Sequence, residues 1–286
     1  MDAFFQDIIA ARATEEGKQW LNKALEAARN PGNPNVLLGY YAGAARRMGK
    51  VALNLSDAEK ARLAEQDSEI SLDHWGLDEA TRVLLLLNLS KSLSPDDYQD
   101  WVFRCYESGD SREQESWLRG LAVIPGGDKQ LHWAMDATRT NIIPVFEAIA
   151  CENPYPTRYF PELNFNQMVL KALFVGVSIW RIFKLESRFN ADLSRMSDDY
   201  ITEREVAGRT VPVDIWLAVC PYGDHKALER AAGYLDNDDP NHRLWAATGL
   251  GHAGNKDFIP ALEARGKVEP EADVKKAIET ALSRLG

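Results

Sequence analysis

Apolar residues recur at three- and four-residue spacing along almost the whole chain, and this periodicity constrains the fold most. In the first helix-like segment, Phe4, Ile8 and Ala11 fall on one face. Such spacing is typical of an α-helix that packs on one side, whereas a half-buried strand needs strict alternation. No alternating run of β-branched residues occurs, and the proline in residues 211–213 (VPV) argues against a strand there. The sequence therefore predicts an all-α protein.

Local signals place several helix starts. Asp78 and Glu79 open the very apolar run 83–89, where acidic side chains interact favourably with the helix dipole. Asp78 and Arg82 are four residues apart, which predicts a local ion pair. Ser94 followed by Pro95 is typical of a helix N-cap and first helical position.

The composition changes near Cys220. Beyond it, residues 227–236, 241–252 and 257–264 read as short alanine- and leucine-rich helices, followed by a last helix with an apolar stripe to Leu285. Short helices joined by Asp-Pro and Gly-Asn turns resemble HEAT-type helical hairpins. We expect a helical-hairpin superhelix (an α-α solenoid), with residues 1–220 as one all-helical domain and residues 221–286 as HEAT-like hairpins packed on it.

Composition excludes several classes of function. The chain has 286 residues and a net charge of −10, which argues against binding to nucleic acid or to an anionic membrane surface. Three widely spaced cysteines without a CxxC pair favour a reducing compartment. No run of about 18 apolar residues predicts a membrane span, and the acidic N-terminus is unlike a signal peptide. We therefore expect a cytoplasmic protein.

Motifs for cofactors and metals are weak. Residues 249–254 (GLGHAG) match the dinucleotide pattern GxGxxG, but they follow a helical run rather than a strand, so we interpret them as turn glycines between helices. None of the five histidines has another histidine three or four residues away to share a metal ion. The sequence predicts no cofactor and no metal site.

The stretch from Arg139 to Gly176 places costly polar groups inside strongly apolar sequence. We expect Asn141 to cap a helix that carries Glu147. The run 153–156 (NPYP) is expected to break that helix, because prolines disfavour helix interiors. Pro161 or Glu162 is expected to restart the chain, and residues 166–180 are expected to form a long apolar helix.

Charged and amide groups in such surroundings must be paired or must form a site, since burying one alone costs several kcal/mol. Glu147 is the expected counter-charge of Lys171 or Arg139. One hypothesis is a structural network that fixes how two helices and a loop meet. The other is a small-molecule pocket with aromatic walls and a few convergent polar groups. For that pocket the candidate ligand-binding residues are Arg139, Asn141, Glu147, Tyr155, Asn166, Gln167 and Lys171.

The same stretch resembles the EboA family, whose signature is similar to RTN, VFEAIA, NPYP and NQMVLKALFVG in residues 139–176. The similarity includes residues 78–86 (DEATRVLLL), runs to about Arg209, and weakens after Pro221. Glu152 and residues 191–199 depart slightly from the family pattern. The resemblance implies a bacterial protein from a gene cluster that also encodes a UbiA-like membrane prenyltransferase, a TatD-like hydrolase and relatives of sugar-phosphate enzymes, and that is associated with traffic of natural-product precursors.

Two functions follow as expectations. The first is a non-enzymatic helical adaptor or carrier that holds a small aromatic or isoprenoid-like metabolite, or a protein of the same gene cluster, and no residue is assigned a catalytic role. The alternative is an enzyme that processes that precursor, with Glu147 and Lys171 as acid and base, because burial and neighbouring charges shift both pKa values.

Overall fold

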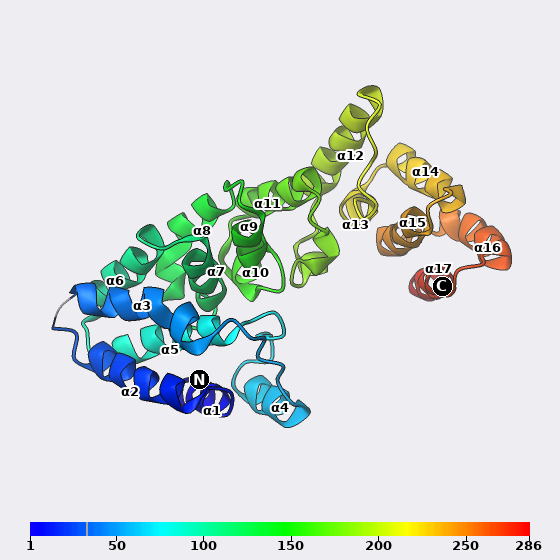
Figure 1. Ribbon diagram of the computed structural model, residues 1–286. Coiled ribbons are helices and arrows are strands. Elements are labelled where there is room, and N and C mark those ends of the chain that lie inside the picture. The colour runs from blue at the N-terminus through cyan, green and yellow to red at the C-terminus, as the bar shows by residue number, and fades with distance from the viewer. Residues whose placement is uncertain (33) are drawn as a thin grey trace. The chain divides into compact units, whose positions relative to one another are not determined.

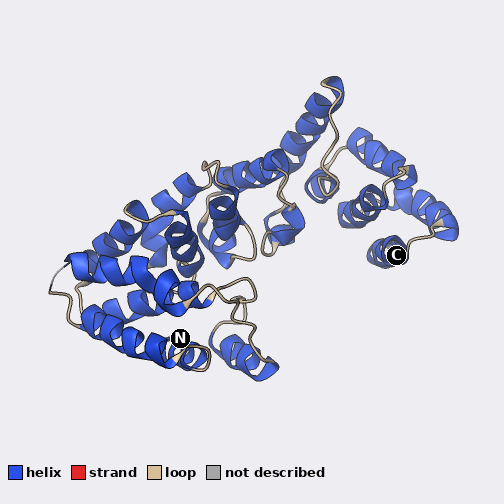
Figure 2. Cartoon of the chain, viewed as in Figure 1, coloured by secondary structure: helices blue, strands red, loops and turns tan. Residues whose placement is uncertain are grey.

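A computed structural model describes residues 1–32 and 34–286, and in these ranges the chain forms helices joined by loops (Figures 1 and 2). The all-α prediction is confirmed for the described residues, among which the β-type backbone pairing is limited to one isolated bridge between Ala52 and Gly76. The helices group into two compact units, residues 1–160 and 161–286. Within the described ranges, no helix is both long and apolar enough to cross a bilayer. The predicted domain boundary at residue 220 and the HEAT-like arrangement stay predictions.

The first unit contains ten α-helices and one short 3-10 helix in its described part. They are α1 (Asp2–Ala10), α2 (Glu15–Arg29), α3 (Pro34–Met48), α4 (Asp57–Gln66), α5 (Leu77–Leu89), α6 (Pro95–Glu107), α7 (Ser111–Gly120), η1 (Gly127–Gln130), α8 (Leu131–Ala137), α9 (Ile143–Ala150) and α10 (Pro154–Tyr159).

Helix α5 is the centre of this unit. It packs against α1, α2, α3 and α7, and every residue from Leu77 to Leu89 is buried. A helix enclosed on all sides is expected to be apolar all round, yet α5 carries five polar residues. Each of these needs an internal partner, because a buried polar group without one costs free energy.

The second unit contains seven α-helices and five short 3-10 helices. They are α11 (Glu162–Val175), η2 (Ile179–Arg181), η3 (Leu185–Arg188), α12 (Ala191–Val206), α13 (Trp216–Val219), η4 (Cys220–Tyr222), α14 (His225–Gly233), η5 (Tyr234–Asp236), α15 (Pro240–Ala253), η6 (Lys256–Phe258), α16 (Ile259–Val268) and α17 (Ala272–Leu285).

Helix α15 has the central place here, in contact with α13, α14 and α17. The dinucleotide-like glycines lie on it, so our interpretation of them as turn residues is wrong for two of the three. Gly249 and Gly251 lie inside the helix, where an added Cβ would come within 2.5 Å of the Trp216 carbonyl oxygen and 2.7 Å of the Ala281 Cα. Only Gly254 ends the helix, with a φ of +67° that glycine adopts without strain.

The second unit also buries a three-residue ion cluster, which we call the Glu269 cluster. Arg243 donates from Nε and Nη2 to the two carboxylate oxygens of Glu269 at 2.9 and 2.8 Å, and Arg265 Nε donates to Glu269 at 2.7 Å. Hydrogen bonds from Arg243 and Arg265 lower the pKa of Glu269 to about 2. Arg243 Nη1 also donates to the carbonyl of Asn237, so the cluster fastens the turn before α15.

Helix ends were predicted less well than helix starts. Ser94 caps α6 with Pro95 at its first position, as predicted, and the chain restarts at Glu162, one of the two positions that we expected. The long helix predicted for residues 166–180 is wrong at both ends, because α11 begins four residues earlier and stops at Val175. Gly176 ends it by adopting a left-handed φ of +78°, and the chain turns before η2.

Candidate functional site

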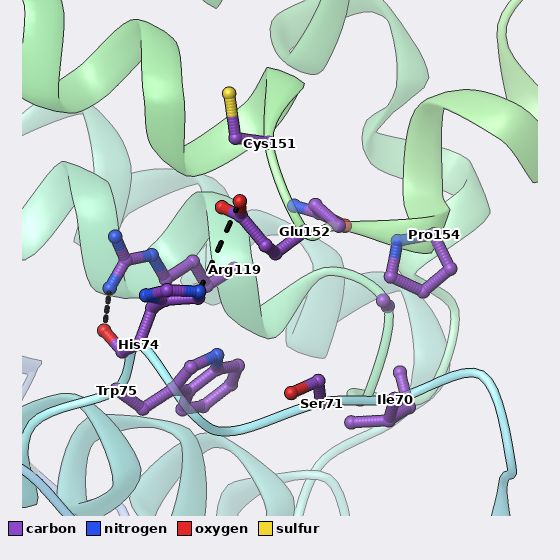
Figure 3. Close-up of a pocket in the computed structure, with 10 residues that line it drawn as sticks. Ile70, Ser71, His74, Trp75, Arg119, Cys151, Glu152 and Pro154 are labelled. Carbon is purple, nitrogen blue, oxygen red and sulfur yellow. Dashed lines mark hydrogen bonds and ion pairs between the residues drawn. The ribbon is translucent and has the colours of Figure 1, made fainter. Parts of the chain in front are cut away.

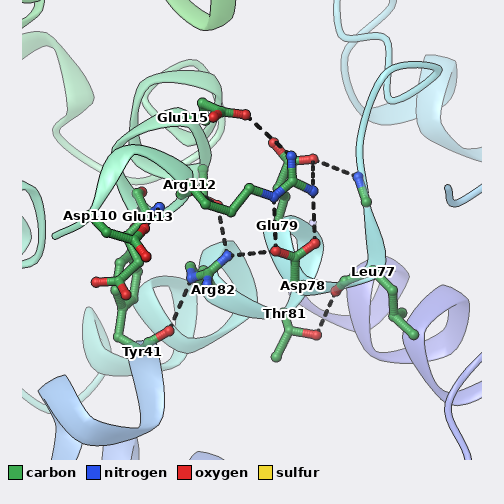
Figure 4. Close-up of polar contacts among 12 residues, drawn as sticks. Tyr41, Leu77, Asp78, Glu79, Thr81, Arg82, Asp110, Arg112, Glu113 and Glu115 are labelled. Atoms are coloured by element: carbon green, nitrogen blue, oxygen red, sulfur yellow. Dashed lines mark hydrogen bonds and ion pairs between the residues drawn. The ribbon is translucent and has the colours of Figure 1, made fainter. Parts of the chain in front are cut away.

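Charged residues of α5 meet arginines from α7 in a cluster, which we call the α5 cluster (Figure 4). Its members are Asp78, Glu79 and Arg82 on α5 and Arg112 and Arg119 on α7. Asp78 and Glu79 are fully buried, and Arg82 is 1% exposed. Arg82 Nη1 donates to Asp78 at 2.9 Å, which confirms the predicted local ion pair. Arg112 adds a two-pronged contact, with Nε and Nη2 donating to the two Asp78 oxygens at 3.0 and 2.9 Å. Such paired geometry is among the stronger charged hydrogen bonds in proteins.

Glu79 completes the α5 cluster and caps the helix that carries it. Its carboxylate accepts a hydrogen bond of 2.6 Å from the backbone N–H of Gly76 and one of 2.8 Å from Arg119 Nη1. Arg112 Nη2 lies 3.0 Å from the same carboxylate. A glutamate at the third helical position that reaches back to the N-cap backbone is half of a capping box.

The two neighbouring carboxylates differ electrostatically. Burial acts to raise the pKa of Asp78, but the hydrogen bonds from Arg112 and Arg82 outweigh it, so this pKa lies below its usual range. Burial also acts on Glu79 and there outweighs Arg119 and Arg112, so the Glu79 pKa is raised. Environments that push the pKa values of adjacent carboxylates apart are typical of functional sites, and also of structural ion networks.

A small pocket lies beside this cluster, and Arg119 joins the two (Figure 3). Arg119 Nη1 donates to the carbonyl of His74 at 2.6 Å as well as to Glu79. Across the pocket, His74 Nε2 lies 3.9 Å from a carboxylate oxygen of Glu152. Glu152 adopts a left-handed φ of +49°, which side-chain-bearing residues rarely do outside turns and functional sites.

The pocket is too small for a metabolite as it stands. It leaves a volume of about 10 Å³ for the centre of a water-sized sphere, which is room for about one water molecule. Its charged groups also contact one another. We therefore interpret the pocket and the α5 cluster as structural features of the first unit.

Asn153 and Pro154 of the run 153–156 also line this pocket. The helix that carries Glu147 ends before this run, at Ala150, so the expected break is confirmed; the run is nevertheless not free of helix, because it begins α10. Pro154 and Pro156 lie in the first turn of α10, where backbone N–H groups have no helical acceptor and proline is tolerated. Asn153 makes the corner before α10. Its Nδ2 donates to the carbonyls of Ala148 and Leu118, and its Oδ1 accepts from the Tyr155 N–H.

Four of the predicted ligand-binding residues lie in the first unit. Arg139 is 80% exposed and lies 3.7 Å from Asp136, while Glu147 is half-buried. Asn141 is exposed and does not cap α9, because the N-cap is Ile142 and the chain turns one residue later than predicted. Tyr155 is buried, and its hydroxyl donates to the Gly127 carbonyl at 2.7 Å. Burial raises its pKa.

The other three lie on α11 in the second unit. Asn166 is buried and exchanges two hydrogen bonds of 3.0 Å with Asn190, the N-cap of α12. Gln167 is exposed, and Lys171 is half-buried, with its pKa lowered by burial. The expectation that all seven residues form one cluster stays a prediction.

Sequence reasoning missed Arg112 and Arg119 as members of a charged cluster. Both arginines are more than 30 residues from their carboxylates in the chain, so no local spacing links them. The available signal was the pair Asp78 and Glu79 at the start of a helix whose later residues are apolar, since charges there need partners from elsewhere.

The described residues offer little for covalent or metal chemistry. All three cysteines are buried, and burial raises the pKa of Cys105 to about 12 and that of Cys220 further, so these two thiols are poor nucleophiles. No group of three or more His, Cys, Asp or Glu side chains suited to a metal ion is present in the part of the chain that the structure describes.

Comparison with known proteins assigns the family. The family model for the metabolite traffic protein EboA matches residues 1–220. Neither a curated protein sequence nor a solved structure matches the chain significantly. Since the family model covers well over half of the 286 residues, this chain belongs to the EboA family of metabolite traffic proteins.

Proposed function

We propose that this protein is a non-enzymatic helical adaptor or carrier in bacterial metabolite traffic, and that it binds a small aromatic or isoprenoid-like molecule. Family membership supports the general role. The binding surface that we propose is one face of α11 in the second unit.

The observation that carries the proposal is the exposed face of α11. Leu163 is 60% exposed and Phe174 is 68% exposed, whereas six other residues of α11 are buried. Leu163, Gln167, Leu170 and Phe174 follow the i, i+4, i+7, i+11 spacing of one helical face, and Lys171 lies beside Gln167 on it. Apolar side chains left in water next to a few polar groups are typical of binding surfaces.

Lys171 gives this face its selectivity. Burial lowers the Lys171 pKa, so its ammonium group lies in partly apolar surroundings. In such surroundings an oxygen or a negative charge on the ligand interacts more strongly than it would in open water. We propose that Gln167 and Lys171 orient the polar end of the metabolite while Leu163 and Phe174 contact its apolar body.

In the first unit, we propose that Arg139, Asn141 and Glu147 offer polar contacts near the start and along the length of α9. Tyr155 would act indirectly by supporting the surrounding packing, because its ring is fully buried and its hydroxyl donates to the Gly127 carbonyl. Asn166 would act indirectly by holding α11 to Asn190.

The ion pairs of the buried carboxylates and the raised pKa values of two thiols favour a carrier over an enzyme. The carboxylates of the α5 cluster are matched by arginines, and the thiols of Cys105 and Cys220 resist deprotonation. One observation favours the enzyme alternative: a lysine with a lowered pKa is a better base near neutral pH. In that alternative, Lys171 and Glu147 exchange a proton with the bound precursor.

We further propose a cytoplasmic location and, as partners, proteins of the same gene cluster, including the membrane prenyltransferase. An adaptor of this kind would hold the metabolite between the enzyme that makes it and the one that uses it. The net charge of −10 makes direct attraction to an anionic membrane surface unfavourable, so docking would be to protein.

Native mass spectrometry tests the proposal on protein purified from cells that carry the whole gene cluster. We expect a bound small molecule, or a co-purifying cluster protein, on the wild type. Both should be reduced at least tenfold in Phe174→Ser and in Lys171→Gln. The control is Lys226→Gln, an exposed lysine on α14, which should behave as wild type.

Two results would overturn the carrier proposal. One is wild-type protein with no ligand and no partner from these cells. The other is chemical conversion of the retained molecule on incubation, abolished by both Glu147→Gln and Lys171→Gln, which would establish the enzyme alternative.

A further inference from the structure

A second hollow lies in the C-terminal part of the chain, in the groove between α15 and α17. Its volume is about 280 Å³, compared with about 10 Å³ for the pocket beside the α5 cluster. Its apolar part comes from Leu244 and Trp245 on α15 and from Ala277 on α17. Both helices belong to the second unit and pack against each other along their length (Figure 1). The groove is thus of a size to hold one small ring system.

The floor of the groove is rigid. Gly251 of α15 lies so close to α17 that an added Cβ would come within 2.7 Å of the Ala281 Cα. Small residues at a helix crossing let the two backbones approach closely, and interiors packed in this way deform little. The groove therefore exists before any ligand arrives, which reduces the entropy lost on binding.

The rim of the groove carries an excess of positive charge in a protein of net charge −10. Lys276 and Arg284 line it, against the single carboxylate of Asp273. Among the described residues, no carboxylate lies within 4.0 Å of either cation. Two other hollows of this unit differ: one is lined by equal numbers of acidic and basic residues, and in the other the acidic residues outnumber the basic ones.

Arg284 makes an unusual contact that supports an anion site. Its Nη1 lies 2.6 Å from His252 Nε2. A guanidinium group can only donate, so His252 Nε2 must accept and the imidazole is neutral. Burial and the nearby Arg284 both lower the His252 pKa, while Glu186 acts weakly in the opposite direction. His252 therefore does not neutralise the positive charge of Arg284, and this charge can interact with an anionic ligand.

Trp245 supplies the flat surface. Its ring is nearly parallel to that of Trp180, with 6.4 Å between the centroids and 19° between the planes. Trp180 is 57% exposed, so the pair presents an aromatic surface at the edge of the groove. Aromatic rings bury large apolar area and stack on planar ligands at little entropic cost.

We propose that the groove between α15 and α17 is a binding site for a small aromatic anion, whose ring packs on Trp245 and Ala277 and whose negative group is held by Arg284 and Lys276. The residues that line the groove lie outside residues 1–220, the part of the chain that the family model matches, and only Trp180 at its edge lies inside that range. It is also distinct from the face of α11, so it does not depend on the function proposed above.

Isothermal titration calorimetry of the full chain with two matched probes tests this site. The anionic probe is naphthalene-2-sulfonate, and the neutral probe is 2-naphthalenemethanol, which has the same ring. We expect the wild type to bind the anion at least tenfold more tightly than the neutral probe. Arg284→Gln and Lys276→Gln should each remove most of that preference and leave the weak binding of the neutral probe unchanged.

The control variant is Lys267→Gln, an exposed lysine on α16 that does not line this groove. It removes the same charge and should bind both probes as the wild type does. Both Arg284→Gln and Lys276→Gln are measured, because a result from one of them still tests the site if the other variant does not fold.

Nuclear magnetic resonance of His252 gives a second readout. A bound anion offsets the charge of Arg284, so we expect the His252 pKa to rise when naphthalene-2-sulfonate binds, and also in unliganded Arg284→Gln. The proposal is overturned if the wild type binds neither probe at millimolar concentration or binds both equally. It is also overturned if the variants with Arg284 and Lys276 replaced keep the wild-type preference.

Discussion

The α5 cluster and the Glu269 cluster both bury arginine–carboxylate contacts, but they have opposite effects on their glutamates. Glu269 receives hydrogen bonds from two arginines, and its pKa falls to about 2. Glu79 is also approached by two arginines, yet its pKa is raised. The difference lies in two influences on Glu79: Arg112 also bonds to Asp78, and the effect of burial on the Glu79 pKa outweighs that of the arginines. Arginine contacts alone thus do not set the protonation of a buried acid.

The clusters also differ in what they connect. The α5 cluster joins a fully enclosed helix to α7 and, through Arg82 Nε, to the Tyr41 carbonyl of α3. The Glu269 cluster ties a turn and the end of one helix to α15. Loss of the first should therefore affect the core of a whole unit, whereas loss of the second should affect mainly its edge.

The largest expected effect is that of Arg82→Met. The change removes one of the two arginines that bond to Asp78, and it removes the side-chain donor to the Tyr41 carbonyl and to Ser116 Oγ. Breaking one side of a buried ion pair typically costs about 3–5 kcal/mol. Urea unfolding followed by circular dichroism should show this loss in the free energy of unfolding.

The matched control for Arg82 is Arg195→Met, which removes an arginine that is 63% exposed and pairs with acids on its own helix. We expect a change below about 0.5 kcal/mol for it. A loss below about 1 kcal/mol for Arg82→Met would contradict the central place of the α5 cluster.

A smaller effect is expected for Glu269→Gln, with a dependence on pH. At pH 7 the loss should be about 2–3 kcal/mol, because hydrogen bonds between charged groups are replaced by neutral ones. The folded-state pKa of about 2 lies below the unfolded value of about 4.3, so the contribution of Glu269 is complete above that unfolded value. It is lost as the pH falls toward 2. Urea unfolding of wild type and variant at several pH values between 5 and 2.5 should show the gap closing.

Glu79→Gln sharpens this comparison because its effect on stability should depend on pH in the opposite direction to that of Glu269→Gln. The folded-state pKa of Glu79 is raised, so the stabilising contribution is present below the unfolded pKa and is lost as the pH rises through the folded one. The gap between wild type and Glu79→Gln should therefore widen on acidification. A gap that closes, as for Glu269, would show that the two glutamates do not differ as described.

Asn166→Ala extends the comparison to a neutral pair. Asn166 and Asn190 exchange two hydrogen bonds, and Asn190 Oδ1 also caps α12 through the Leu193 N–H. Losing one partner of a buried hydrogen-bonded pair costs about 1–2 kcal/mol. Thermal unfolding measured by differential scanning calorimetry should show a lower Tm, and binding to naphthalene-2-sulfonate should stay unchanged.

The smallest effect is expected for Arg139→Ala. Arg139 is 80% exposed and lies 3.7 Å from Asp136, so solvent screens the pair. The free energy of unfolding should change by less than about 0.5 kcal/mol. If this variant nevertheless loses a retained metabolite in native mass spectrometry, Arg139 acts as a ligand contact and not as a structural residue.

The sequence was sufficient to predict what depends on nearby residues. Helical periodicity gave the fold class, Ser94 and Pro95 gave a helix start, and Asp78 and Arg82 gave an ion pair within one turn. These features depend on contacts within a few positions of the chain, which a spacing rule can detect.

The rest depends on distant parts of the chain. Arg112 and Arg119 reach α5 only because α7 packs beside it, and no local pattern shows this. Gly249 and Gly251 resemble loop glycines in sequence, but α13 and α17 leave no space for side chains there. The effect of a proline depends on its place in a helix: α9 ends before Pro154 as expected, but Pro154 and Pro156 then begin a new helix, α10.

One amide side chain limits how far the small pocket can open. Asn153 bonds to the end of α9, the start of α10 and the Leu118 carbonyl of α7, so three hydrogen bonds fix this wall of the pocket. The opposite wall is anchored too, where Arg119 holds the His74 carbonyl and the Leu53 N–H donates to the Trp75 carbonyl. Any guest larger than water would have to break several of these bonds together, so the backbone around the pocket holds it near its present volume of about 10 Å³.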